Sequence, residues 1–440
     1  MRKKVSCICL NLEFNVSKEH LCSLMRRKKI LLAFVAILIC LTLFFNSLIR
    51  EVTFYFPILS VQQNVCDVSS LHLRISNHHL TTIAPNKCWH GDAVYGNFCV
   101  ISPYSQRATE EDASVTLTTQ GTVEYLHHVV VLCRRWAGPI SVAVFTPPDD
   151  YSAARQVADR LRDCDFCIRR WVSWHFFHYN VPMPSYMDTE IPKDCKFLTQ
   201  DQKTKKRRSD GIYPINVGRN LARAKTNTPY VFPIDIELYP SAGILPKFER
   251  MLHSINLSEG LHVWVLPVFE VFSKYRAPIT KGELKTMFAK KQAISFHQYR
   301  CNICHKIPNL TQWINNEESY QSEVTESLEA LKVWTTVKRS KKYQLHVWEP
   351  FFIGTRDDPE FDIRLSWEGR QNKMQVAFEM CLMDYNFHII ENAFLVHSPG
   401  ISIYNASEEK FRDKYSVQNN KLISTIRKDL IKKYGPNKDC

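Results

Sequence analysis

The stretch Tyr230-Val-Phe-Pro-Ile-Asp-Ile-Glu237 joins an apolar run to two closing carboxylates. Asp235 and Glu237 are two residues apart, so on a strand both side chains point to the same side. Open α/β sheets bind their ligands at the carboxyl ends of the strands. The stretch therefore predicts a buried strand over residues 230–237 with an acidic site at its end.

Strand and helix patterns alternate around this stretch. Strand patterns cover residues 115–119, 140–145, 167–172 and 263–269, and helix patterns cover residues 122–136, 152–164, 213–225 and 406–436. Such alternation is typical of α/β folds. We therefore expect one α/β domain over residues 111–440, with a mixed, mainly parallel central sheet.

The two acids need a compensating cation. Mg²⁺ and Mn²⁺ prefer carboxylate oxygens and bridge to phosphates, so Asp235 and Glu237 are candidate ligands in a nucleotide-diphosphate-sugar site. His397 ends the apolar run Phe394-Leu-Val-His397 and is a candidate third ligand. A metal here would stabilise the departing diphosphate as a Lewis acid. Two solvated acids in a turn are the alternative for so short a motif.

A polar helix face precedes the acidic strand. Asn216, Arg219, Asn220 and Arg223 recur at helical spacing and share one face of the expected helix. This face suits a sugar or a diphosphate, and a solvated surface is the alternative. Lys373 is a further candidate for the diphosphate.

Residues 30–49 form an uncharged apolar run that is long enough to span a bilayer. Arg26-Arg27-Lys28-Lys29 precedes the run, whereas Arg50 and Glu51 after it cancel, so residues 1–29 are expected in the cytosol. The sequence thus predicts a cytosolic tail, a transmembrane anchor over residues 30–49, and a stem with an N-terminal cap over residues 50–110. A cleaved signal peptide is the alternative.

The cysteines indicate an oxidising compartment, since eleven of the 15 lie beyond the apolar run. Cys164-x-x-Cys167 and Cys301-x-x-Cys304 resemble halves of a zinc site, but their wide separation and the lumenal context favour disulfides. Three glycosylation sequons support exposure to the secretory pathway; they begin at Asn256, Asn309 and Asn405.

The composition narrows the function. With 45% hydrophobic and 23% charged residues, the chain is too apolar to be disordered and too charged to be a polytopic transporter. The net charge is +13, and residues 1–29 contribute +6 of it. A mildly basic body suits anionic partners such as nucleotide-sugars, and no basic motif with interleaved aromatic residues indicates nucleic acid.

Taken in order, these motifs resemble glycosyltransferase family 49, which includes β-1,4-glucuronyltransferase and the C-terminal domain of LARGE. The resemblance covers roughly residues 112–440. Its segments are residues 115–119, 138–145, 213–223, 232–241, 267–270, 348–354, 359–364, 369–373 and 392–400.

The resemblance implies a GT-A-type fold, a Golgi type II anchor and Mn²⁺-dependent transfer from a UDP-sugar. Asp235 and Glu237 match the acidic pair of the family, and His397 matches its late histidine. Glu237 stands where the family commonly has a second aspartate. Residues 366–373 are one residue longer than the family pattern and include Glu368, which leaves the donor and the acceptor open.

We therefore expect a Golgi enzyme that transfers glucuronic acid in β-1,4 linkage to xylose on a glycan or glycoprotein acceptor. One alternative is a β-1,3-N-acetylglucosaminyltransferase acting on galactose-ended chains. Another is a catalytically degenerate lumenal protein that only binds glycans. The sequence is also compatible with a homodimer.

Inverting transfer requires a carboxylate that takes the proton of the acceptor hydroxyl. Glu368 and Asp362 are the candidates. Glu368 precedes an expected helix that starts near Arg370, and a helix N-terminus favours the ionised carboxylate. An ordinary acid in the first helical turn is the alternative for Glu368.

Aromatic residues near these acids offer stacking surfaces for sugar rings. The candidates are Trp348, Phe351 and Trp367. For each of them taken alone, packing in the core is the more frequent role.

Overall fold

The structure is a computed structural model that describes residues 88, 93–95, 97–107, 113–180, 212–257, 259–316, 329–340, 342–398, 400–401 and 405–440. These residues belong to a unit that spans Thr81–Cys440. The expected tail and the expected anchor lie outside the described residues. Among the helices that the structure describes, none has both the length and the apolar composition needed to cross a bilayer.

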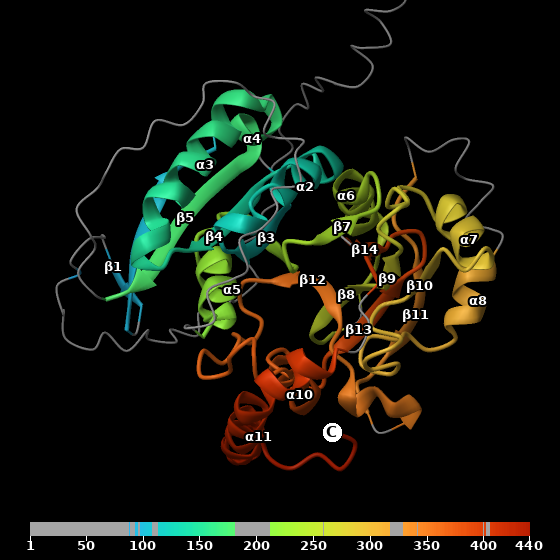
Figure 1. The fold of residues 1–440 in the computed structure, drawn as a ribbon. Helices are drawn as coiled ribbons and strands as arrows, with labels where there is room; N and C mark the ends of the chain where they lie inside the picture. Colours follow the sequence, from blue (N-terminus) through green and yellow to red (C-terminus); the bar gives the residue numbers. More distant parts are fainter. Residues whose placement is uncertain are drawn as a thin grey trace, which may run out of the picture. The chain divides into compact units, whose positions relative to one another are not determined.

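A mixed sheet of ten strands forms the centre of the described fold (Figure 1). Its strand order is β1 (Ala93–Tyr95), β2 (Phe98–Ser105), β5 (Val172–Tyr179), β4 (Ile140–Phe145), β3 (Val115–Gly121), β6 (Tyr230–Pro233), β12 (Phe351–Thr355), β8 (His262–Leu266), β13 (Asn386–Ile390) and β11 (Val333–Val337). The α/β class and the mixed sheet are confirmed.

The expectation of a mainly parallel sheet holds only for part of this sheet. Parallel pairing joins β5 to β4, β4 to β3, β3 to β6, and β13 to β8. The other neighbouring strands are antiparallel. The expected strand over residues 263–269 is divided between β8 and β9 (Val268–Val271), which lie in different sheets.

A second sheet brings the late histidine to the acidic turn. Its strand order is β10 (Ala293–Ser295), β9, β14 (Leu395–His397) and β7 (Leu238–Pro240). His397 pairs in register with Leu238, and the Ser398 N–H donates to the carbonyl of Glu237 at 3.0 Å. Residues that are about 160 positions apart in the sequence thereby become neighbours.

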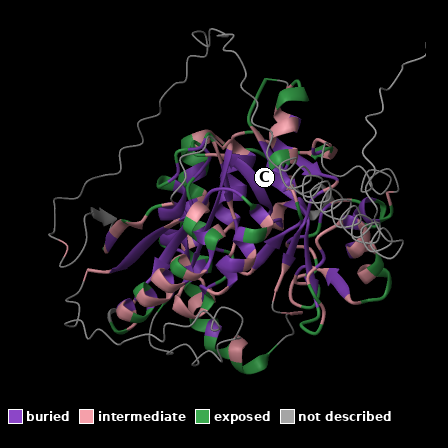
Figure 2. Ribbon diagram, turned by 90° about the horizontal axis from the view of Figure 1, so that it is seen from above, coloured by how far each residue is buried: buried purple, intermediate pink, exposed green. Residues whose placement is uncertain are grey.

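Helices cover both faces of the β3–β4–β5 region. Val142 and Val144 of β4 pack in one core cluster with α2 (His128–Trp136), α3 (Tyr151–Cys164) and α4 (Phe166–Trp171). Ala143 and Phe145 point to the opposite face and pack with α5 (Ile215–Ala224). The strands are consequently buried, as the purple centre of Figure 2 shows.

Gly218 allows α5 to lie close to the sheet. A Cβ atom at this position would lie 2.9 Å from the Cβ of Gln120 and 3.2 Å from the Phe177 ring. Such distances are shorter than normal packing allows, so a larger residue would push the helix outward. The close approach holds α5 against the end of β3.

Two local expectations are wrong for identifiable reasons. Residues 166–171 form helix α4 instead of a strand, because the Asp165 carboxylate caps the helix by accepting the Ile168 N–H at 3.2 Å. Strand β6 ends at Pro233, which has no N–H for a sheet ladder. Asp235 and Glu237 therefore lie in the turn between β6 and β7.

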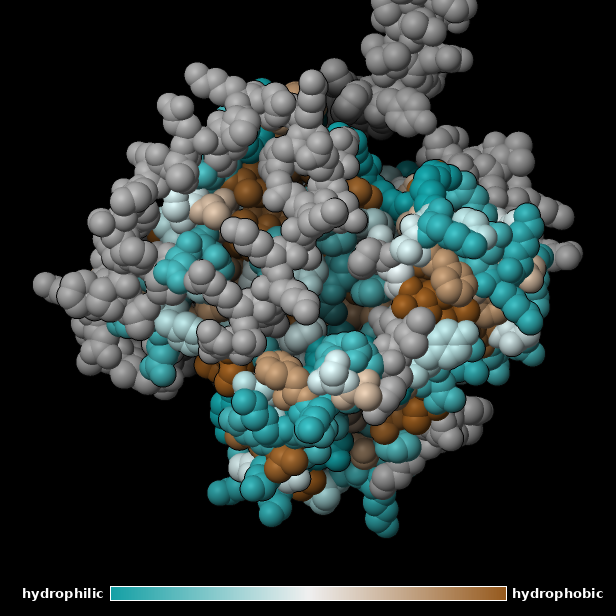
Figure 3. Space-filling view, viewed as in Figure 1, coloured by the Kyte–Doolittle hydropathy of each residue, from teal (hydrophilic) through white to brown (hydrophobic). Residues whose placement is uncertain are grey.

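The remaining helices lie mainly in the C-terminal half. They are α6 (Ile244–Ser254), α7 (Lys281–Ala289), α8 (Leu310–Asn315), α10 (Met374–Leu382) and α11 (Ala406–Tyr434). The expected C-terminal helix is thus confirmed. The surface over α10 and α11, in the lower part of Figure 3, is mainly hydrophilic with small hydrophobic spots.

Disulfides involve both of the Cys-x-x-Cys motifs, as expected. The bonds described are Cys88–Cys99, Cys133–Cys167, Cys301–Cys304 and Cys381–Cys440. Cys164 is also disulfide-bonded, but Cys167 is paired with Cys133 and not with Cys164. The bond between Cys133 and Cys167 joins α2 to α4.

Candidate active site

A cavity of about 700 Å³ lies at the carboxyl ends of the parallel strands β3 and β6. Gln120 and Gly121 line it from the end of β3, and Asp235 and Glu237 line it from the turn after β6. Residues 367–368 and the first turns of α11 form other parts of the wall. The two acids predicted from the sequence therefore face one cavity at the edge where α/β sheets bind ligands.

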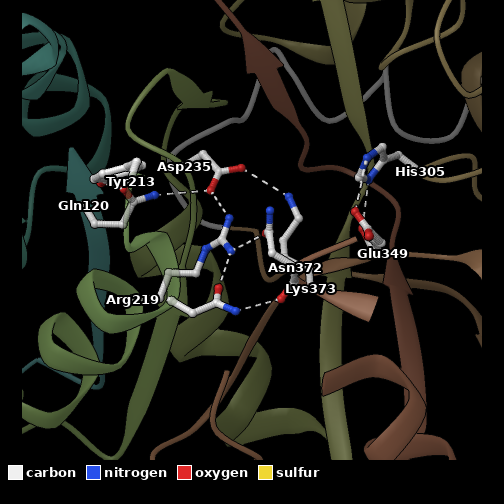
Figure 4. A network of polar contacts seen from close by, with 9 residues as sticks. Gln120, Tyr213, Arg219, Asp235, His305, Glu349, Asn372 and Lys373 are labelled. Carbon is white, nitrogen blue, oxygen red and sulfur yellow. Dashed lines mark hydrogen bonds and ion pairs between the residues drawn. The ribbon is translucent and has the colours of Figure 1, made fainter. Parts of the chain in front are cut away.

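Asp235 is held by two cations that come from different elements (Figure 4). Arg219 Nη2 on α5 lies 2.6 Å from Asp235 Oδ1, and Lys373 Nζ lies 3.1 Å from Oδ2. Gln120 Nε2 approaches Oδ1 at 3.5 Å. Burial opposes ionisation, but Lys373 and Arg219 outweigh it and hold the pKa of Asp235 well below its ordinary value.

Arg219 connects the acidic turn to the loop before α10. Its Nη1 donates to Asn216 Oδ1 at 2.8 Å and to Asn372 Oδ1 at 2.6 Å. Asn216 Nδ2 donates in turn to the carbonyls of Asn372 and Asp362 at 3.0 and 2.8 Å. Two residues of the predicted polar face thus fix the geometry around Asp235.

The other two residues of this face contact backbone. Asn220 exchanges hydrogen bonds with Phe361, donating to its carbonyl at 2.7 Å and accepting its N–H at 2.9 Å. Arg223 donates to the carbonyls of Pro359 and Asp358, both at 2.9 Å. Both side chains are buried and hold the segment 358–361 against α5.

Glu237 differs electrostatically from its neighbouring acid. Burial, followed by the negative charge of Asp235, raises the pKa of Glu237 to about 7. A divalent cation between the two carboxylates would offset both effects, because it supplies the missing positive charge. The carboxylate pair therefore fits a hard metal ion such as Mn²⁺ or Mg²⁺.

His397 lies next to this turn through the β7–β14 pairing. Burial lowers the pKa of His397, which keeps the imidazole neutral and able to ligate a metal, and its Nδ1 lies 3.2 Å from the carbonyl of Gly400. Among the described residues, no three His, Cys, Asp or Glu side chains are grouped closely enough to hold a metal.

The two candidate bases occupy different surroundings. Glu368 is buried and lines the cavity, and its carboxylate oxygens accept the Tyr213 N–H at 3.1 and 3.3 Å. Asp362 is paired with Arg364, whose Nη2 lies 2.6 Å from Oδ2, and it borders a separate cavity of about 470 Å³.

The helix expected to begin near Arg370 begins later. Arg370 and Gln371 have φ angles of 59° and 53°, in the left-handed region, and α10 starts at Met374. Glu368 therefore does not precede a helix N-terminus, and that expectation is wrong. The carboxylate is instead held by the backbone N–H of Tyr213.

The aromatic candidates separate by burial. Trp348 and Phe351 are 1% and 3% exposed and belong to the core, whereas Trp367 lines the cavity. The Phe351 ring does reach the polar network, because Lys373 Nζ lies 3.9 Å from its centroid. Of the three, Trp367 is the residue placed to contact a ligand in the cavity.

Sequence reasoning missed several residues of the site. Gln120 and Tyr213, which hydrogen-bond to each other, line the cavity, as does Arg412 of α11. Gln120 directly follows the strand pattern over residues 115–119. Its position at the carboxyl end of a strand could have indicated a ligand-binding residue. His305 and Glu349 are not part of this lining. They form a neighbouring contact, in which His305 Nδ1 donates to the carbonyl of Glu349 at 2.9 Å (Figure 4).

Comparisons with known proteins agree with the sequence motifs. A family model described as glycosyl-transferase for dystroglycan matches residues 114–435. Beta-1,4-glucuronyltransferase 1 of Danio rerio is 28% identical over 336 residues, which cover 73% of this chain and 74% of the relative. Xylosyl- and glucuronyltransferase LARGE1 of Homo sapiens is 22% identical over 334 residues, which cover 76% of this chain and 37% of the relative.

One solved structure, S. aureus TarS in complex with UDP, has a TM-score of 0.30 at 9% identity. The match covers 70% of this chain and 72% of that chain, and it is too weak to bear on fold or function. The family model, by contrast, spans most of the chain and its relatives are sugar transferases. The resemblance to glycosyltransferase family 49 is thereby confirmed, and the chain belongs to the family of glycosyl-transferases for dystroglycan.

Proposed function

We propose that this glycosyltransferase has a GT-A-type fold and transfers glucuronic acid from UDP-glucuronate to a glycan acceptor, in β-1,4 linkage to xylose. The observation that carries the proposal is the cavity at the ends of β3 and β6, with Asp235 and Glu237 in its wall. Beta-1,4-glucuronyltransferase 1, at 28% identity, supports the choice of sugar and linkage.

The cationic residues position the acidic turn. Arg219 and Lys373 keep Asp235 ionised and fix its two oxygens in place. Both cations are also close enough to the turn to attract a diphosphate, and Lys373 lies directly before α10. Asn216 acts through Arg219, and Asn220 and Arg223 act by holding segment 358–361.

Asp235 and Glu237 are the proposed ligands of Mn²⁺ or Mg²⁺. His397, which lies beside their turn, is the proposed third ligand and would have to move toward the two carboxylates when the metal binds. A bound metal would neutralise the charge of the departing diphosphate. Glu368 is the proposed acceptor of the proton from the attacking hydroxyl, because it lines the cavity, whereas Asp362 is engaged by Arg364.

The proposed setting is the Golgi lumen, with residues 30–49 as a single membrane anchor and residues 1–29 in the cytosol. The sequence pattern supports this topology. The disulfides in the described part of the chain suit an oxidising lumen.

The test is metal-dependent turnover by the full-length chain purified in detergent. UDP release is measured with UDP-glucuronate, with and without Mn²⁺ and a xylose-ended acceptor. Asp235→Asn should lower the rate by roughly 100-fold or more, since it removes a charge aimed at the reaction centre. Asp357→Asn, at an exposed loop position, is the matched control and should leave the rate unchanged.

Two results would reject the proposal. One is the absence of Mn²⁺-dependent UDP release or UDP binding, which would favour a protein that only binds glycans. The other is turnover with UDP-N-acetylglucosamine and a galactose-ended acceptor but not with UDP-glucuronate.

A further inference from the structure

Arg412 carries the only cationic side chain among the described residues that line the cavity. Arg219 and Lys373 are paired with Asp235 and do not form part of this lining. The cavity therefore has one pair of acids at Asp235 and Glu237 and, on the α11 side, Arg412 beside two further acids, Glu368 and Glu408. Arg412 is thus the position in this described lining whose charge attracts an anionic group on a ligand.

The guanidinium of Arg412 is buried and held in place. Its side chain is 7% exposed, and its central carbon lies 3.8 Å from the centroid of the Trp367 ring, which also lines the cavity. Stacking on an aromatic ring orients a guanidinium without using its N–H donors. Arg412 Nε makes no hydrogen bond, although it lies 3.3 Å from Glu408 Oε1.

The acids of α11 near Arg412 also contact other cations. Glu408 is shared, because Arg300 Nη2 also lies 3.0 Å from it. Glu409 is paired with Arg370. Burial lowers the pKa of Arg412, and the charges of Glu408 and Glu368 oppose this shift. Arg412 is thus paired with Glu408, which also binds Arg300, and is stacked on the Trp367 ring. A buried cation with one shared carboxylate partner can still bind an anionic ligand.

We propose that Arg412 binds the carboxylate of a uronic acid and so selects the donor sugar. This inference rests on the proposed function and assigns a residue to its donor specificity. The planar guanidinium matches a carboxylate in two parallel hydrogen bonds, which a neutral sugar does not offer. The diphosphate is the other anion of the donor, and the experiment distinguishes the two.

The experiment compares three ligands that differ in one group at a time. UDP-xylose has the sugar ring of UDP-glucuronate without its carboxylate, and UDP has no sugar. Affinities are measured by calorimetry in the presence of Mn²⁺ for the wild-type chain, Arg412→Met and Arg412→Lys. Lys410→Met is the matched control, because it removes a cation from an exposed position of the same helix that is not part of the cavity lining, and it should change none of the three affinities.

Arg412→Met should weaken UDP-glucuronate by roughly 10- to 100-fold, as expected for lost charge-assisted hydrogen bonds, and should change UDP-xylose and UDP by less than about twofold. Arg412→Lys should fall between the wild type and Arg412→Met. Glu408→Gln, which keeps Arg412, provides a second arm if Arg412→Met does not fold, and it should bind UDP-glucuronate at least as tightly as the wild type.

Several outcomes overturn the inference. An equal loss for all three ligands would assign Arg412 to the diphosphate or to a structural role. A wild-type chain that binds UDP-xylose as tightly as UDP-glucuronate would reject it while leaving sugar transfer intact. A wild-type chain that binds neither UDP nor any UDP-sugar would reject the proposed function itself.

Discussion

Lys373 Nζ lies 3.1 Å from Asp235 Oδ2, although the two residues are 138 positions apart in the sequence. Arg219 occupies the other oxygen of the same carboxylate at 2.6 Å. Asp235 is therefore ionised, while the pKa of Glu237 is raised to about 7 by burial and by its charged neighbour. Two acids that look equivalent in the sequence therefore differ in acidity, because the ion pairs with Arg219 and Lys373 are made by Asp235 and burial dominates at Glu237.

Replacing Arg219 should destabilise the fold. Arg219→Met leaves the carboxylate of Asp235 with one cation fewer and leaves Asn216 and Asn372 without their shared donor. We expect a loss of about 3–5 kcal/mol in the free energy of unfolding, measured with urea, as for other broken buried ion pairs.

The control for this change is Arg276→Met. Arg276 Nη2 lies 2.7 Å from Glu283 Oε1, but both side chains are exposed, at 67% and 38%. Its loss should be at most about 1 kcal/mol. Equal losses for Arg219→Met and Arg276→Met would show that burial of the Asp235 pair does not matter.

Asn419 of α11 should prove necessary for the cavity wall at residues 366–370. Its Nδ2 donates to the carbonyls of Ser366 and Arg370 at 3.0 and 2.8 Å. Asn419→Ala should cost about 1–3 kcal/mol in unfolding free energy, because the buried amide loses two hydrogen bonds to backbone carbonyls, and should weaken UDP-glucuronate binding. Gln418→Ala, at the exposed preceding position, should change neither measurement, and a matching effect there would contradict the assignment.

Stability should fall in acid through buried histidines such as His175. Burial lowers the pKa of His175 to about 3, whereas the unfolded chain binds a proton near pH 6.5. The stability that the neutral ring contributes is thus present above pH 6.5 and is lost as the pH falls toward 3, by up to about 1.4 kcal/mol per pH unit. His175→Gln should reduce the change in unfolding free energy, measured with urea, between pH 7 and 5. An unchanged pH dependence would argue against His175 as its origin.

The disulfide between Cys381 and Cys440 should contribute more stability than the one between Cys301 and Cys304. The first closes a separation of 59 residues and the second a separation of 3. Paired Cys→Ser changes should cost about 4 and about 2 kcal/mol respectively, from the loop entropy of the unfolded chain. The ranking would fail if calorimetry gave the short loop the larger loss.

Local pattern was sufficient where a segment is stabilised by its own sequence. The bounds of β4 are those expected, because a continuous apolar run is followed by Pro147 and Pro148. Helix α5 and helix α11 were also expected from spacing alone. For residues 166–171 the local pattern gave the wrong element. Their composition is typical of a strand, but they form a helix whose N-terminus is capped by Asp165.

The site was predicted only as far as residue type and order allow. The spacing of Asp235 and Glu237 predicts that their side chains lie together. It does not predict that Lys373, far along the sequence, forms an ion pair with Asp235. Trp348 and Trp367 are the same residue type, and only tertiary packing puts one in the core and the other in the cavity. The place of Arg412 in the cavity wall could not be predicted for the same reason, because the basic residues of a surface helix are usually solvated.

Helix α11 makes the cavity sensitive to events far from it. Its first turns form part of the wall, Asn419 holds the loop 366–370, and the segment after the helix is tied to α10 through Cys440. A reducing environment, or a truncation that removes Cys440, would break the disulfide that ties the end of α11 to α10. Asp235 and its two cations would stay in place. Expression of active protein should consequently depend on the oxidative maturation of a bond that contacts no substrate.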